Sequence, residues 1–188
     1  MLEIPGRDVT IEDTAAFHYC RGLHLLDEGR PAEALEHAEA ALEIQPEHVQ
    51  SLVLAAAVYT FQGKELGLGI DVSSRAALNC YERALAVEPE LAEAWSGKAF
   101  LLLRLDRPEE ALAAADCGLA ALTHPVGPDM DDPEVQVKIA ENLFSNKIRA
   151  LLAIGRKDEA RQALSDGFEH CPQSEYLTRH LKWFLPER

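Results

Sequence analysis

The histidines and cysteines are the residues of this sequence best suited to metal binding or nucleophilic chemistry, but their spacing favours neither. The seven histidines form no HExxH and no Cys/His zinc spacing. The four cysteines lie far apart and form no CxxC, which is typical of reduced thiols used as small apolar residues. His170 and Cys171 fall at an expected helix end, where a histidine suits the helix dipole. We therefore predict no metal site and no cysteine nucleophile.

Two short stretches suggest other chemistry and also lack the required pattern. "LGLGI" at 66–70 contains GxG, whereas dinucleotide binding needs a full GxGxxG after a strand. "DMDDPE" at 129–134 concentrates carboxylates without the spacing and glycine of a calcium loop, so a solvated helix cap is the favoured interpretation. Serine, histidine and aspartate occur without a nucleophile elbow. The sequence predicts no catalytic residue and no cofactor, and hence a protein that is not an enzyme.

A fifteen-residue stretch occurs four times in register, and it determines which elements the chain must form. The copies are "EALEHAEAALEIQPE" at 33–47, "AALNCYERALAVEPE" at 76–90, "EALAAADCGLAALTH" at 110–124 and "EARQALSDGFEHCPQ" at 159–173. Their second residue is always alanine: Ala34, Ala77, Ala111 and Ala160. The step from the second copy to the third is 34 residues, and the other two steps are longer by 9 and 15, as insertions would make them. Since two helices approach closely only where a side chain is small, we expect each alanine to face a partner helix.

Each copy is preceded by another helical pattern, which gives four helix pairs. A first helix follows a capping box at Thr10 and runs to Gly29, and Pro31 opens the second. The connector of the next pair contains Gly67 and Gly69, and Ser73 or Ser74 is expected to cap the helix after it. Asp132 and Pro133 are expected to begin a long helix that reaches about Ile154. The tail "SEYLTRHLKWFLPE" is expected to form a ninth helix whose Leu177, Leu181, Trp183 and Phe184 cover the last pair.

Composition and charge agree with a helical array and exclude some classes of partner. The chain has 188 residues, 47% of them hydrophobic, which is enough to bury a sizeable core. The net charge of −14 argues against nucleic acid and anionic membranes, because both reward basic patches. Residues 1–48 hold 11 acids and 3 bases (net −8), and residues 133–188 hold 8 acids and 9 bases (net +1). No signal-peptide or membrane-span pattern is evident, so a cytoplasmic protein without membrane insertion is expected.

The chain resembles the tetratricopeptide repeat (TPR) family from Thr10 onward. The resemblance rests on the repeat and on the bulky and small first-helix positions Gly22 and Leu25, Leu52, Ala56 and Tyr59, Trp95, Ala99 and Leu102, and Phe144, Ile148 and Leu151. It departs from the family at His18, at Thr123 and at the two insertions. It implies an all-α fold, an α-solenoid with a right-handed superhelix in one domain. The expected parts are repeat 1 at 10–47, repeat 2 at 48–90 with an insertion at 64–72, repeat 3 at 91–124, a proline-rich loop at 125–132, repeat 4 at 133–173 and a capping helix and tail at 174–188.

By the same resemblance, the first helices line a concave groove that binds a peptide or helix of another protein, as in a scaffold, adaptor or assembly chaperone. The predicted groove residues are Tyr19, Cys20, Leu23, Val53, Leu54, Ala57, Phe61, Phe100, Leu103, Asn142, Ser145, Asn146 and Arg149. Those of repeats 1 to 3 form an apolar stripe, which usually marks a binding surface. Those of repeat 4 are polar, so we expect a ligand that is acidic or C-terminal near Arg149.

One specific function of the family is not expected here. TPR proteins that bind the EEVD tails of Hsp70 and Hsp90 use a clamp of Lys, Asn, Asn, Lys and Arg. The corresponding positions hold Tyr19, Leu23, Leu54, Glu93 and Gly97, or in the next window Val53, Ala57, Gly97, Asn142 and Asn146. Because neither set supplies the clamp, we predict no binding to an EEVD-ended peptide.

Two competing interpretations remain open. The acidic N-terminal half of one copy can meet the basic C-terminal repeat of the next, which would build a homo-oligomer. Alternatively, the chain's own segment "MLEIPGRDV" at 1–9, or the terminal helix of a second copy, covers the apolar stripe.

Overall fold

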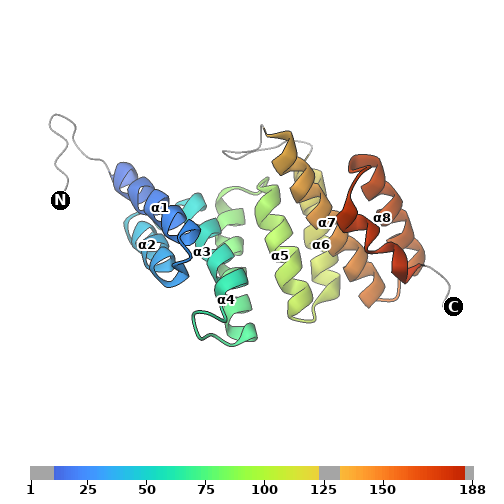
Figure 1. The fold of residues 1–188 in the computed structure, drawn as a ribbon, viewed down its shortest axis with the longest axis horizontal. Coiled ribbons are helices and arrows are strands. Elements are labelled where there is room, and N and C mark those ends of the chain that lie inside the picture. The colour runs from blue at the N-terminus through green and yellow to red at the C-terminus, as the bar shows by residue number, and fades with distance from the viewer. Residues whose placement is uncertain (1–10, 123–131, 185–188) are drawn as a thin grey trace. The chain divides into compact units, whose positions relative to one another are not determined.

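The computed structural model describes residues 11–122 and 132–184, and within them the chain is a series of α-helices (Figure 1). The helices are α1 (Ile11–Asp27), α2 (Pro31–Ile44), α3 (Val49–Gln62), α4 (Ile70–Val87), α5 (Ala92–Arg104), α6 (Pro108–Ala121), α7 (Pro133–Ala153), α8 (Lys157–His170) and the short α9 (Glu175–Thr178). A 3-10 turn, η1 (Leu181–Trp183), follows α9. These residues contain no strand, which confirms the all-α helical repeat fold expected from the sequence.

The chain divides into two compact units, Met1–Val87 (unit 1) and Glu88–Arg188 (unit 2). In unit 1, α1 pairs with α2 and α3 pairs with α4, while α2 packs on α3 and α1 touches α3. In unit 2, α5 pairs with α6 and α7 pairs with α8, while α7 packs on both α5 and α6. Each unit is therefore two helix pairs packed side by side around its own core.

The alanines that recur in the sequence lie at the contacts between paired helices. Ala34, Ala77, Ala111 and Ala160 all have 0% of their surface exposed, as expected. Glycine at the ninth position of two repeats allows an even closer approach. A Cβ built on Gly118 would lie 2.9 Å from the Cβ of Trp95 on α5, and one built on Gly167 would lie 3.3 Å from the Cβ of Phe144 on α7. The small residues therefore set how closely the helices pack.

Three of the four hairpin turns are built alike. The residue before the turn's arginine takes a positive φ, 73° at Gly29, 56° at Asp106 and 80° at Gly155. The arginine that follows bonds the glutamate three residues later, with Nε···Oε1 distances of 2.7 Å for Arg30 and Glu33, 2.6 Å for Arg107 and Glu110, and 2.6 Å for Arg156 and Glu159. The buried alanine comes one residue after each glutamate, so the turn fixes which side of the second helix faces its partner.

The fourth turn, between α3 and α4, differs from the expected connector. The sequence predicted an insertion at 64–72 with a cap at Ser73 or Ser74, but α4 already begins at Ile70. Ser73 and Ser74 are buried within the helix, and the Ser73 hydroxyl donates to the Ile70 carbonyl at 3.1 Å. The early start has a packing reason, since a Cβ on Gly63 would lie 2.5 Å from the Cβ of Ser73. The chain packs closely at Gly63, and residues 70–72 of the predicted insertion form the first turn of α4.

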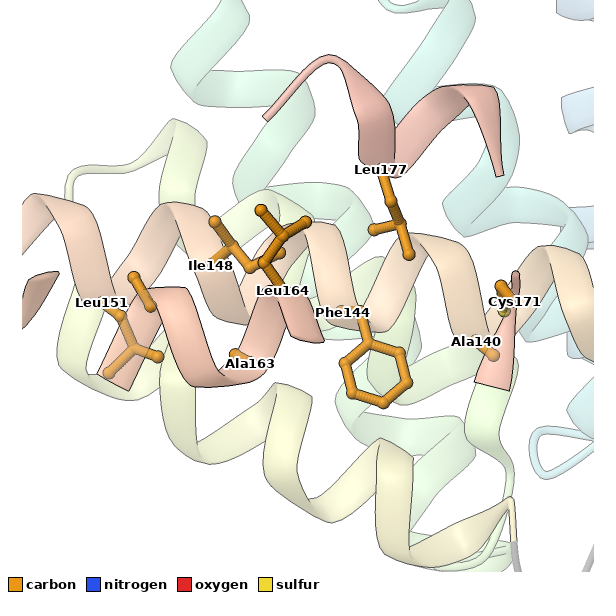
Figure 2. Close-up of a cluster of buried hydrophobic side chains, with 9 residues drawn as sticks. Ala140, Phe144, Ile148, Leu151, Ala163, Leu164, Cys171 and Leu177 are labelled. Atoms are coloured by element: carbon orange, nitrogen blue, oxygen red, sulfur yellow. The ribbon is translucent and has the colours of Figure 1, made fainter. Parts of the chain in front are cut away.

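A core cluster of unit 2 lies between α7, α8 and α9 (Figure 2). Its buried members are Ala140, Phe144, Ile148, Leu151, Ala160, Ala163, Leu164, Cys171 and Leu177.

The Asp132 side chain caps α7 by accepting from the Glu134 amide at 2.8 Å, and Pro133 occupies the first turn, as predicted.

The C-terminal segment covers this core with Leu177 and Phe184, and the helix expected from residue 174 is shorter than predicted. Helix α9 has four residues and gives way to η1. Leu177 is fully buried above Gly167, whereas Leu181 and Trp183 are 41% and 43% exposed. The Ser174 hydroxyl caps the short helix by accepting from the Leu177 amide at 3.0 Å. Leu177 and the partly buried Phe184 pack on the core, whereas Leu181 and Trp183, which follow the end of α9, stay exposed.

Candidate protein-binding faces

In unit 1 the exposed sides of α1 and α3 form an apolar surface, which we call the α1–α3 face. It comprises Tyr19, Cys20, Leu23, Val53, Ala57 and Phe61. Phe61 is 70% exposed and Leu23 is 39% exposed, while Tyr19, Val53 and Ala57 are half-buried. Cys20, Leu23, Ala57 and Phe61 recur at spacings of three or four residues, so they lie on one side of each helix. The structure thus places six of the seven groove residues predicted for this unit at its surface.

Leu54, the seventh, belongs to the core. It is 4% exposed, and its Cδ2 lies 2.8 Å from the position of a Cβ built on Gly22. The absence of a side chain at Gly22 therefore creates the space that Leu54 fills between α1 and α3. We correct the expectation that Leu54 lines an open surface, because it has no free face for a ligand.

In unit 2 the corresponding surface, which we call the α5–α7 face, is aromatic and basic. It comprises Phe100, Leu103 and Arg104 of α5 with Asn142 and Arg149 of α7, all of them half-buried. The guanidinium carbons of Arg104 and Arg149 lie 5.7 and 5.9 Å from the centre of the Phe100 ring. The Phe100 ring therefore makes cation–π contacts with the guanidinium groups of two helices, which places two positive charges close together.

Ser145 and Asn146 were predicted for the same face, but both are buried and already bonded. The Ser145 hydroxyl and Nε2 of His180 are 2.7 Å apart, and the Asn146 amide donates to the Ser96 carbonyl at 3.2 Å. Asn146 thus links α7 to α5, and Ser145 links α7 to the C-terminal segment. We correct the expectation that they hydrogen-bond a ligand.

His180 was missed by the sequence analysis, although it stands beside the α5–α7 face. It is 6% exposed, its Nδ1 has no partner among the described residues, and its ring centre lies 4.6 Å from that of Trp183. Burial, followed by the charges of Arg149 and Lys182, lowers the pKa of His180 from 6.5 to about 4. The imidazole is therefore neutral near pH 7, and the positive neighbours reveal a basic environment. No spacing rule would have found this residue, since its partner Ser145 is 35 positions away.

Other chemistry is limited in the described parts of the chain. No group of three or more histidine, cysteine, aspartate or glutamate side chains in residues 11–122 and 132–184 is arranged to hold a metal ion. None of the described helices is long and apolar enough to cross a membrane. The positions that correspond to the EEVD-binding clamp hold no lysine or arginine. The side-chain amide of Asn146, one of these positions, donates to the Ser96 carbonyl.

Comparisons with known proteins agree with this architecture. Two tetratricopeptide repeat models match, one at residues 15–48 and one at residues 73–121. No curated protein matches the sequence.

Among solved structures, TTC0263, a thermophilic TPR protein of Thermus thermophilus, has a TM-score of 0.63 at 20% identity, covering 88% of this chain and 78% of that one. MamA from Desulfovibrio magneticus RS-1 has a TM-score of 0.70 at 15% identity, covering 93% and 85%. The Sgt2 TPR domain from Aspergillus fumigatus has a TM-score of 0.57 at 20% identity, covering 76% and 82%. At these identities the likeness shows a shared fold, and the two matching repeat models show that the chain contains tetratricopeptide repeats.

Proposed function

We propose that this protein binds segments of a partner protein on the α1–α3 and α5–α7 faces and so acts as a scaffold, adaptor or assembly chaperone. The TPR fold supports a protein–protein interaction module. The observation that carries the proposal is the exposure of large apolar side chains on the α1–α3 face, Phe61 at 70% and Leu23 at 39%. Apolar groups gathered on one surface favour a partner that removes them from water.

The α1–α3 face favours an apolar ligand. Its side chains lie at helical spacing on two neighbouring helices, which suits the apolar side of an amphipathic helix or alternate side chains of an extended peptide. No member of this face carries a charge, so binding here should depend weakly on salt. A glutamate in place of Leu23 or Phe61 would have to be desolvated on binding, which strongly opposes it.

The α5–α7 face favours a ligand that carries carboxylates. Arg104 and Arg149 both approach Phe100, and a guanidinium binds a carboxylate through two parallel hydrogen bonds. Asn142 is half-buried on the same side of α7 and can donate from its amide. We propose that acidic side chains or a chain terminus of the partner bind here.

The test uses a phage-displayed peptide library selected on the full-length protein. Enriched peptides should carry apolar residues at helical spacing, or clustered Asp and Glu. Leu23→Glu with Phe61→Glu should abolish binding of the first class, and Arg149→Glu should abolish binding of the second. Asn79→Glu is the matched control, since Asn79 is exposed on α4 outside both faces. Leu54 is not substituted, because a buried glutamate would unfold unit 1.

If no peptide is enriched, or if the selected peptides bind the face variants as well as they bind the wild type, the proposal fails. Circular dichroism must show that every variant keeps its helicity.

Self-assembly is a second candidate, and the uneven charge of the chain favours it. Residues 1–48 carry a net −8 and residues 133–188 a net +1, so opposite ends of two copies attract. Light scattering over a range of salt concentrations separates the two functions. A head-to-tail oligomer should dissociate as ionic strength rises, whereas a monomer at every ionic strength would remove this candidate.

A further inference from the structure

Two histidines face each other between α1 and α2, in a position where a TPR pair normally has apolar packing. Nδ1 of His18 and Nδ1 of His37 are 2.9 Å apart, and both side chains are half-buried. The ring centres are 5.1 Å apart, only 2.2 Å more than the two nitrogens, so the nitrogens point almost directly at each other. This is the geometry of one hydrogen bond in which one Nδ1–H donates and the other Nδ1 accepts.

The number of protons on the pair decides whether that bond exists. Two neutral rings share one Nδ1–H between them. A first added proton can sit on the far nitrogen of the donor ring, which leaves the bond in place and strengthens it by charge. A second added proton occupies the accepting Nδ1. Both nitrogens then carry hydrogen, no lone pair remains, and two positive rings are in contact, so the contact becomes repulsive.

The surroundings hold the two rings together and make double protonation costly. Burial, then the charge of His18, then that of Arg21 lower the pKa of His37, against smaller opposing effects of Glu36 and Glu33. A Cβ on Gly22 of α1 would lie 3.2 Å from the Ala34 carbonyl of α2, so the backbones are already in close contact here. From α3 the neighbour of Gly22 is the apolar Leu54. This close backbone contact of α1 with α2 keeps the two rings near each other.

We propose that the His18–His37 contact is an acid-sensitive clasp that holds α1 on α2 and releases it when both rings are protonated. Helix α1 contributes the buried Ala15 and Leu25 to the core of unit 1. It also carries Cys20 and Leu23 of the α1–α3 face. Acidification therefore loosens α1 and dismantles that face, while unit 2 has no counterpart of the pair among its described residues.

Hydrogen exchange of the full-length protein tests the clasp, independently of any ligand. Peptides covering α1 are compared with peptides covering α5 at about pH 7.5 and about pH 5, the range in which histidine titrates, after correction for intrinsic exchange. We expect protection of α1 to fall about tenfold or more at the lower pH, equivalent to at least one unit of pKa coupling, with little change in α5.

Two variants identify the cause. In His37→Asn and in His18→Asn, the amide nitrogen takes the place of Nδ1 and can donate to the remaining ring without taking up a proton. The acid-induced loss of α1 protection should disappear in both. His24→Asn is the control, because His24 is exposed on α1 and pairs with Glu28, and it should keep the wild-type response.

The clasp is refuted if α1 of the wild type keeps its protection at the lower pH, or if the two variants lose protection as the wild type does. Since both Asn variants are measured, failure of one to fold still leaves the other to decide. Peptide binding is not part of the readout, so this result is independent of the proposed binding function.

Discussion

Replacing Gly118 with alanine should destabilise unit 2, although alanine is the better helix former. Gly118 lies in α6, where a Cβ would be 2.9 Å from the Cβ of Trp95 and would overlap the end of the Leu143 side chain. The Leu143 side chain is fully buried and the Trp95 Cβ is fixed to the backbone, so α5 or α7 must shift. Such overpacking costs about 1–3 kcal/mol. The helix gains about 1 kcal/mol from losing a glycine, which leaves a net loss of up to about 2 kcal/mol.

Tryptophan fluorescence measures this loss in unit 2 alone. The chain has two tryptophans, Trp95 and Trp183, and both belong to unit 2. For a unit of this size, each kcal/mol of that loss lowers the midpoint of thermal unfolding by about 4–8 °C. Cys117→Ala is the control, because Cys117 is exposed next to Gly118 and its replacement should change stability by less than about 0.5 kcal/mol.

A double-mutant cycle shows whether the clash is the cause. Leu143→Ala alone should cost about 2–5 kcal/mol by leaving a cavity. In the double variant the new methyl group enters part of that cavity, so the total loss should be smaller than the sum of the single losses. A higher midpoint for Gly118→Ala, or strict additivity in the cycle, would show that the α5–α6–α7 contact has spare room.

Four further predictions follow from the geometry. Ala111→Leu, at a fully buried position, should lower the free energy of unfolding of unit 2 by about 1–3 kcal/mol, and an unchanged urea midpoint would contradict the repeat alignment. Asp106→Gly should raise it by roughly 0.5–1 kcal/mol, because Asp106 has a φ of 56° where other turns use glycine, and a lowered midpoint would contradict this reasoning. The pKa of His180 is about 4 when folded, so the unfolded chain binds the extra proton and stability should fall by at most about 3 kcal/mol between about pH 6.5 and 4. His180→Gln should flatten that profile, and identical profiles for variant and wild type would exclude His180 as its source. A peptide ending in EEVD should give no binding signal in calorimetry, whereas micromolar affinity would mean that the clamp positions were misassigned.

The fold was predictable because its determinants are local and repeated. The alanine of each repeat fixes the buried side of a second helix, and Asp132 with Pro133 marks the start of α7 by chemistry that needs no tertiary contact. The start of α4 was misplaced because it depends on the contact of Gly63 with Ser73, which no local signal reveals. The length of helix α9 was overestimated because periodicity shows which residues share a side of a helix, and not where the backbone leaves it.

The candidate faces were only partly predictable, for a similar reason. Helical spacing correctly assigned Leu23 and Phe61 to an exposed side. Spacing could not show that Leu54 fills the space above Gly22, or that Ser145 is engaged by a histidine far along the chain. Three expectations lie outside the described residues: the segment at 1–9 as a cover of the apolar stripe, the capping box at Thr10 and the loop at 125–131.

Three of the turns between paired helices place the second helix in the same rotation relative to the first. In each of them a residue with positive φ, an arginine and a glutamate stand within the five positions before the buried alanine of the second helix. The α3–α4 connector reaches the same phase at Ala77 by a longer route. A reporter peptide inserted near the exposed Gly67 should therefore leave the helices in register, which makes this connector the natural place to label the protein without disturbing either face.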